Sequence, residues 1–230
     1  MKGNLIIYKT PDWLTAFTTG KDSGVEALGL RLEDLALPRQ VHSDNVLWMQ
    51  AAGRPEATDA VITDKSGLCV CVKTADCIPV LLYDSKQRIV AAVHAGWRGT
   101  VARIVQKTIE KMRPISPEDL HAIIGPGISL EWFEVGNEVY EAFRAADFPM
   151  ERIAKRPSKS PLKEDFLPSP LGEEKAFIDL WEANRWLLEE MGVGDIYIEG
   201  TCTRACEKFY SARRETINTG RNYNGIFINS

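Results

Sequence analysis

Residues 78–99, IPVLLYDSKQRIVAAVHAGWRG, contain two apolar runs separated by a polar segment. The runs at 78–83 and 89–94 are rich in β-branched residues, which predicts two strands. The segment 84–88 between them is typical of a hairpin turn, so we expect the strands to pair antiparallel. The glycines of residues 95–99 then turn the chain toward a helix. This stretch therefore predicts a strand–turn–strand–helix unit.

Similar patterns on both sides of this unit extend the prediction. Apolar runs predict further strands near 59–63, 68–74, 121–124, 196–199 and 226–229. Three helices are expected: one that Thr100 caps, with an apolar stripe from Val101 to Met112, and two more near 134–146 and 178–191. The order of these elements favours an α/β fold with a mixed β-sheet and flanking helices rather than a regular doubly wound repeat.

One composition break interrupts an otherwise ordinary globular chain. Residues 155–175 carry Pro157, Pro161, Pro168 and Pro170 among charges and serines, which predicts a flexible surface loop. A domain linker is the rival interpretation, but the segment after it is short for an independent core. We therefore expect a single domain over residues 1–230, in which 44% hydrophobic residues can fill a core.

The charge and the cysteine content narrow the classes of function. A net charge of −4 argues against non-specific binding to nucleic acid or to an acidic membrane surface. No apolar run approaches the roughly 20 residues that span a bilayer, and the first residues lack the pattern of a signal peptide. The expectation is a cytoplasmic protein, in which the five cysteines stay reduced.

Three short motifs place reactive side chains beside predicted strand ends or glycine turns. They are QVHS at 40–43, TADCIP at 74–79 and HAGWRG at 94–99, and they contain His42, Cys77 and His94. Two imidazoles and a thiolate suit zinc, which keeps an open position when it is catalytic. The spacing alone leaves two alternatives: a buried cysteine with two unrelated histidines, or a cysteine nucleophile activated by a histidine.

Four motifs in order resemble one known family. QVHSDNV, TDAVITDKSGLCVCVKTADCIPVLLYD, VAAVHAGWRGT and CTRACEKFYSARRETINTGR are similar to the YfiH/laccase-domain family, also called multicopper polyphenol oxidases and described as purine nucleoside phosphorylases. The resemblance implies an α/β sandwich and a zinc site formed by His42, Cys77 and His94. It also implies phosphorolysis of adenosine, inosine, guanosine and methylthioadenosine, together with deamination of adenosine.

Phosphorolysis requires donors and positive charge for phosphate. Arg98, Arg213, Arg214 and Arg221 could supply them, and Arg98 is the first candidate because its motif places it close to His94. Gln40 faces the same side as His42 on an extended segment, so it either contacts substrate or fixes the loop. The partners expected are therefore purine nucleosides and phosphate.

Other roles are weighed in the same motifs. Asp76 either orients a ligand histidine or caps a turn. Cys69 and Cys71 share one face of a strand and are expected in the core, and Cys202 and Cys206 are also expected to be structural. His121 is expected to satisfy a local hydrogen bond.

Three other functions compete with a zinc phosphorylase. A cysteine hydrolase would use Cys77 with a histidine base. A copper-dependent polyphenol oxidase is disfavoured, because a multicopper centre needs many more histidines than the three in this chain. A non-catalytic protein with a structural zinc would need four protein ligands, and the motifs supply three.

Overall fold

The predicted hairpin is the centre of a six-stranded sheet. In the computed structural model, which describes residues 4–113, 116–156 and 175–230, β7 (Ile78–Asp84) and β8 (Ile89–Ala95) pair antiparallel as expected. The strand order is β13-β9-β7-β8-β5-β4. The flanking strands are β13 (Asp195–Ile198), β9 (Leu120–Ile124), β5 (Ala60–Thr63) and β4 (Val46–Trp48). The sheet is mixed, because the β13–β9 and β4–β5 pairs are parallel whereas β9–β7, β7–β8 and β8–β5 are antiparallel.

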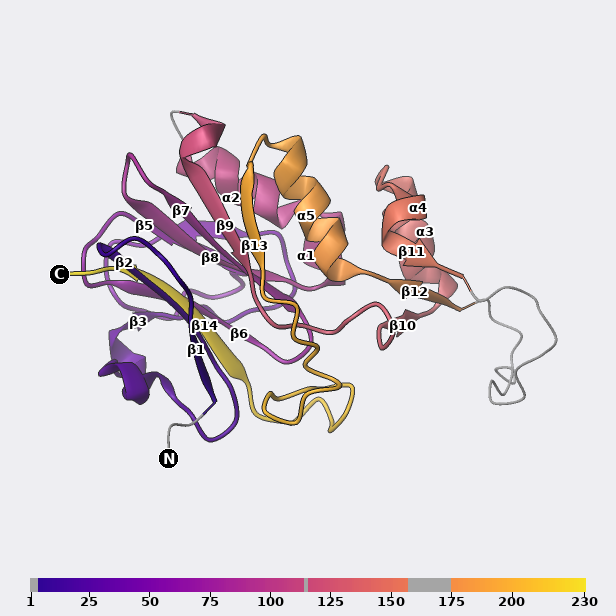
Figure 1. The fold of residues 1–230 in the computed structure, drawn as a ribbon, viewed down its shortest axis with the longest axis horizontal. Coiled ribbons are helices and arrows are strands. Elements are labelled where there is room, and N and C mark those ends of the chain that lie inside the picture. The colour runs from indigo at the N-terminus through magenta and orange to yellow at the C-terminus, as the bar shows by residue number, and fades with distance from the viewer. Residues whose placement is uncertain (1–3, 114–115, 157–174) are drawn as a thin grey trace.

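A five-stranded sheet packs against the first one (Figure 1). Its order is β1-β2-β14-β6-β3, and its strands are β1 (Leu5–Ile7), β2 (Leu14–Thr19), β14 (Asn222–Ile228), β6 (Cys69–Thr74) and β3 (Leu35–Ala36). Strand β14 begins four positions before the predicted 226–229 and pairs with both β2 and β6. The sheet therefore joins the N-terminal and C-terminal parts of the chain.

Side-chain alternation in the central hairpin explains the layers. Leu81 and Tyr83 of β7 pack between the two sheets, whereas Val80 and Leu82 pack under the helices. Both faces are apolar because both are buried, which is why the run lacks a simple polar alternation. The predicted α/β sandwich with a mixed sheet and flanking helices is confirmed.

Helices α1 (Trp97–Val101), α2 (Ile104–Met112) and α5 (Leu180–Glu190) lie on the outer face of the six-stranded sheet (Figure 1). The predicted single helix capped by Thr100 is wrong in two respects. The first turn begins at Trp97, after Gly96, so Thr100 is a buried residue inside α1. Arg103 then adopts a left-handed conformation with φ of 62°, which separates α1 from α2.

A smaller unit lies at one side of the sandwich (Figure 1). It contains a three-stranded sheet with the order β10-β12-β11 and two helices, α3 and α4. The bounds are β10 (Glu134–Val135), α3 (Asn137–Ala145), α4 (Met150–Ile153), β11 (Ala154–Lys155) and β12 (Ala176–Ile178). The helix predicted at 134–146 therefore begins later, because residues 134–135 pair with β12. The predicted 155–175 loop lies outside the described residues except at its ends, where Lys155 closes β11.

Three short 3-10 helices complete the described elements, at Val25–Leu28, Leu32–Asp34 and Pro117–Asp119. The helix predicted at 178–191 is α5, which begins after Asp179, whose side chain accepts a hydrogen bond from the backbone N–H of Glu182. Among the described residues, every helix is too short or too polar to cross a membrane.

Candidate metal centre

Three predicted site residues meet at one end of the sandwich. His94 lies near the end of β8, on the same face as Ala92, which packs against the five-stranded sheet. Cys77 directly precedes β7, whose Pro79 pairs with His94. His42 belongs to the segment between β3 and β4 and has a positive φ of 62°. Residues from three separate parts of the sequence therefore converge.

The metal-binding atoms of His42, Cys77 and His94 all lie within 4.8 Å of one another. The sulfur of Cys77 is 3.8 Å from Nε2 of His42, and the two imidazole rings are 4.8 Å apart, inclined at 72°. His94 is buried, Cys77 half-buried and His42 exposed, so the cluster opens to solvent on the His42 side.

The carboxylate of Asp59 holds both histidines in place. Its Oδ1 lies 2.7 Å from Nδ1 of His94 and also accepts the backbone N–H of His42 at 3.0 Å. Its Oδ2 accepts the N–H groups of Val41 and Ser43 and the hydroxyl of Ser43. Asp59 is fully buried, and these donors satisfy a charge that would otherwise be costly there. The positive φ of His42 is sustained by this ring of hydrogen bonds.

Burial and neighbouring charges move the protonation equilibria of the cluster. Burial alone would raise the pKa of Cys77, but the charge of His94 and a hydrogen bond from His42 lower it to about 6. Burial alone would lower the pKa of His94, but Cys77 and Asp59 raise it to about 9. Burial also opposes ionisation of Asp59, yet the bonds from His94 and Ser43 hold its pKa well below the usual range.

These residues fit a zinc ion by the chemistry of their donors. The Asp59 bond occupies Nδ1 of His94, which leaves Nε2 for a metal, and such carboxylate–histidine pairs are typical partners of zinc sites. Two nitrogens and one thiolate leave a coordination position open. The backbone also makes room for the cluster: a Cβ at Gly96 would lie 3.0 Å from Cδ2 of His42 and 3.1 Å from the sulfur of Cys77.

A cavity of about 640 Å³ opens over the trio. Its lining residues are Gln40, His42, Lys73, Ala75, Asp76, Cys77, His94, Ile128, Phe133, Ala212, Arg213, Ile217 and Arg221. A hollow of about 820 Å³ beside the end of α2 contains none of the predicted site residues.

Arg98 lies outside this cavity. Its side chain is exposed on α1 and lies over the ring of Trp97, with the guanidinium carbon 4.3 Å from the ring centre. Because Arg98 is close to His94 in the sequence, it was predicted to lie at the site. Helix α1 begins at Trp97, however, and turns the side chain of Arg98 away from the strand end.

Gln40 and Arg213 line the cavity, but both are also bound to backbone. The side-chain amide of Gln40 donates to the carbonyl of Lys73 at 2.7 Å and accepts the N–H of Lys73 at 2.8 Å. The guanidinium of Arg213 donates to the carbonyls of Trp132 and Glu134. Gln40 therefore fixes its loop against β6, the second of the two roles predicted for it.

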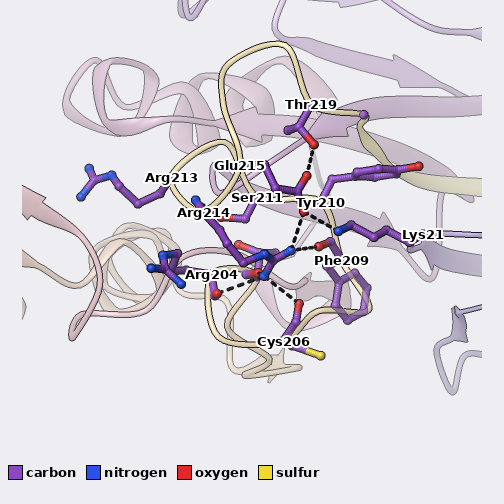
Figure 2. A network of polar contacts seen from close by, with 12 residues as sticks. Lys21, Arg204, Cys206, Phe209, Tyr210, Ser211, Arg213, Arg214, Glu215 and Thr219 are labelled. Carbon is purple, nitrogen blue, oxygen red and sulfur yellow. Dashed lines mark hydrogen bonds and ion pairs between the residues drawn. The ribbon is translucent and has the colours of Figure 1, made fainter.

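The guanidinium of Arg214 lies inside the C-terminal loop rather than in the cavity. It donates to the carbonyls of Thr203, Arg204, Cys206 and Phe209 and pairs with Glu215 (Figure 2). Figure 2 also shows Arg213 pointing away from this network. Arg214 is therefore structural in this arrangement.

Asp76 does not contact either histidine of the trio. Its carboxylate accepts the hydroxyl of Thr203 and the backbone N–H of Arg213, both at 2.7 Å, so it fastens the C-terminal loop to the edge of the cavity. The histidine-orienting carboxylate is Asp59, which sequence reasoning missed. Its position one residue before a strand that pairs with β8 is the signal that could have identified it.

The remaining histidine and cysteines are separate from the cavity. Nδ1 of His121 lies 2.5 Å from the carboxylate of Asp195, which provides the hydrogen bond predicted for this histidine. Its ring also stacks on Tyr83. Cys69 and Cys71 are fully buried, which confirms the prediction of core positions. Cys202 and Cys206 are half-buried, and within the described ranges they belong to no group arranged to hold a metal.

Comparison with known proteins connects this centre to a family. Residues 10–229 match a family model described as multi-copper polyphenol oxidoreductase laccase. A purine nucleoside phosphorylase of Bacteroides thetaiotaomicron is 42% identical over 212 residues, covering 85% of this chain and 74% of that protein. The adenosine deaminase RL5 of an unknown prokaryotic organism is 39% identical over 216 residues, covering 87% of this chain and 77% of that protein.

The fold has close structural counterparts. The crystal structure of Bacillus licheniformis hypothetical protein YfiH superposes with a TM-score of 0.83 at 24% identity, covering 98% of this chain and 96% of that one. The prediction of an enzyme is confirmed by the two sequence relatives, both named as enzymes. From the family model, these relatives and the four motifs, the chain belongs to the multi-copper polyphenol oxidoreductase laccase family, which is the predicted YfiH/laccase-domain family.

Proposed function

We propose that this protein is a zinc-dependent purine nucleoside phosphorylase that acts on adenosine, inosine, guanosine and methylthioadenosine and also deaminates adenosine. The observation that carries the proposal is the His–Cys–His cluster at a cavity of about 640 Å³, a volume within the range of small-molecule sites. The names of the relatives support the same substrate class.

The residues of the cavity divide the work of binding and orientation. His42, Cys77 and His94 would hold zinc, which supplies Lewis-acid polarisation of an oxygen when it is bound. Asp59 fixes the ring of His94 and the backbone of His42, so the donor set is held before any ligand arrives. Ile128, Phe133 and Ile217 form an apolar part of the lining, suited to a purine ring.

The paired activities place different demands on the same cavity. Deamination exchanges the purine amino group for oxygen from water, which requires a polarised oxygen and a route for protons. Phosphorolysis instead requires an anion beside the ribose and stabilisation of the departing base. The cavity is lined by the three proposed zinc ligands and by cationic side chains, a combination suited to both demands.

The test is phosphate-dependent release of free base. Zinc-loaded protein is incubated with inosine, adenosine or methylthioadenosine, with and without phosphate, and base and ribose 1-phosphate are measured. We expect release only with phosphate, and its loss in Cys77→Ala and in His42→Ala. Cys206→Ala, which removes a thiol outside the cavity, is the matched control and keeps the activity. No release by the wild type, or full release by Cys77→Ala, contradicts the proposal.

A cysteine hydrolase is the second candidate. The pKa of about 6 for Cys77 and the imidazole of His42 at 3.8 Å favour a reactive thiolate. Zinc dependence separates the two candidates, because a metal chelator abolishes a zinc phosphorylase and leaves a cysteine hydrolase active. Alkylation of Cys77 in metal-free protein would inactivate both, so the chelator experiment is the deciding one.

A further inference from the structure

A group of cationic side chains lies at the sheet edge beside the trio. Lys73 is next to last in β6 and pairs with Tyr223 of β14, and Arg221 directly precedes β14. Because β6 and β14 are antiparallel, the end of one strand and the start of the other meet at the same edge. Lys73 and Arg221 both line the cavity that contains His42, Cys77 and His94.

The backbone presents Lys73 rigidly while its ammonium group stays free. Both the N–H and the carbonyl of Lys73 are hydrogen-bonded to the side-chain amide of Gln40. In the described ranges, its Nζ makes no hydrogen bond or ion pair. Burial, then the charges of Arg54 and Arg221, lower the pKa of Lys73. A half-buried ammonium is therefore flanked by like charges.

Within the described ranges, neither Lys73 nor Arg221 forms an ion pair, and the carboxylate that lines the same cavity, Asp76, is bound instead by the hydroxyl of Thr203 and the backbone N–H of Arg213. The guanidinium of Arg221 donates to the backbone carbonyls of Ile217, Thr219 and Gly220, which fixes it without neutralising it. Because these positive charges lie close together without an ion-pair partner, they repel one another in the empty site. Binding of an anion would relieve that repulsion.

We propose that Lys73, together with Arg221, forms the subsite for inorganic phosphate. The assignment rests on the proposed phosphorylase function. A phosphate oxygen would form a bond to C1′ of the ribose while the bond from C1′ to the purine nitrogen breaks. The electron pair of that bond goes to the base, which takes up the proton that hydrogen phosphate loses, so that free base and ribose 1-phosphate result. Lys73 provides a compact ammonium for the phosphate oxygens, and the guanidinium of Arg221 adds positive potential.

This assignment differs from the arginine expected from the motif. Arg98 lies outside the cavity, whereas Lys73 lines it. A lone lysine next to the last position of an apolar strand carries no sequence signal of a binding role. The role of Lys73 in phosphate binding can be inferred only from the pairing of β6 with β14, which places Arg221 at the same end of the sheet.

The kinetic test is Lys73→Met, which keeps an unbranched side chain of nearly the same length and removes its charge. We expect the KM for phosphate in inosine phosphorolysis to rise about tenfold or more, since a charge-assisted hydrogen bond is lost. The KM for inosine and the rate of adenosine deamination, which uses no phosphate, stay unchanged. Lys65→Met, an exposed lysine in the turn after β5, is the matched control and leaves all three values as they are. An unchanged KM for phosphate in Lys73→Met overturns the assignment.

A binding measurement separates this inference from the proposed function. Inorganic phosphate is titrated into zinc-loaded protein by calorimetry, with Lys73→Met and Arg221→Met as variants and the exposed Lys65→Met as the control. Phosphate binding that Lys73→Met abolishes and Arg221→Met weakens supports the subsite even where no phosphorolysis occurs, in which case only the proposed function fails. Phosphorolysis with an unchanged KM for phosphate in Lys73→Met overturns only the subsite. Wild-type protein that binds no phosphate, or Lys73→Met that binds it as tightly as wild type, also overturns the subsite.

Discussion

The carboxylate of Asp59 is the side chain on which the geometry of the candidate metal centre depends. It contacts Nδ1 of His94 and the backbone N–H groups of residues 41–43, so it joins two ligands that are 52 positions apart in the chain. Asp59→Asn keeps the size of the side chain but replaces one acceptor oxygen with an NH₂ group, which cannot accept these donors. We expect the affinity for zinc to fall about 10- to 100-fold.

Competition with a chromogenic chelator measures this loss. Asp64→Asn makes the same chemical change at an exposed position just after β5 and should leave zinc affinity unchanged. Equal zinc affinity in Asp59→Asn and wild type would contradict the orienting role of the carboxylate.

The close packing around Gly96 leads to a second prediction about the same centre. A methyl group there meets Cδ2 of His42 at 3.0 Å and the sulfur of Cys77 at 3.1 Å, so one of the ligands must shift. We expect Gly96→Ala to weaken zinc binding about tenfold, the effect of overpacking by roughly 1 to 2 kcal/mol. Gly194→Ala, where an added Cβ meets nothing within 4 Å, is the matched control. The same chelator competition reads both variants, and equal affinities in them would show that the donor set tolerates the displacement.

Some of the strands and helices could be predicted from the sequence, and others could not. The hairpin of β7 and β8 was predictable because apolar runs and a polar turn are local signals. The short strands β1, β3 and β4 were not, because they are defined by partners elsewhere in the chain. The break at Arg103 was hidden by an apolar stripe that continues through it in the sequence.

The candidate site divides in the same way. His42, Cys77 and His94 could be identified from their residue types and from family motifs, which lie close to each ligand. Asp59 and Lys73 could not, because each acquires its role from a strand pairing, with β8 for Asp59 and with β14 for Lys73. Arg98 failed as a cavity residue for the converse reason: a helix start beside a strand end sends neighbouring side chains in different directions.

The loop between β13 and β14 depends on an ion network whose stability should vary with pH. Hydrogen bonds from Lys21, Thr219 and Arg214 lower the pKa of Glu215 from 4.5 to about 2 (Figure 2). Because this pKa is depressed in the folded protein, the contribution of Glu215 to stability is fully present above pH 4.5 and is lost as the pH falls through about 2. Glu215→Gln should therefore lower the free energy of unfolding at pH 7 by about 1 kcal/mol.

Urea unfolding at pH 7 and at pH 3 tests the sign. The difference between wild type and Glu215→Gln should shrink at the lower pH, where the wild-type carboxylate loses part of its advantage. Glu207→Gln, an exposed residue of the same loop, should match wild type at both values. A difference that grows as the pH falls would contradict the assigned contribution.

At the scale of the whole molecule, the three proposed zinc ligands come from the segment before β4, the segment before β7 and the end of β8. We propose that the chain is one domain, so an ion that binds the native cluster stabilises every layer together. With free zinc at 1,000 times its Kd, the gain is about 4 kcal/mol, which raises the Tm of a chain of this size by about 10 °C. Calorimetry of the zinc-loaded and chelator-treated protein should show one transition that moves as a unit. In Cys77→Ala that shift should largely disappear. Two transitions, only one of which responds to zinc, would instead reveal two independently folding units and would confine the metal to one of them.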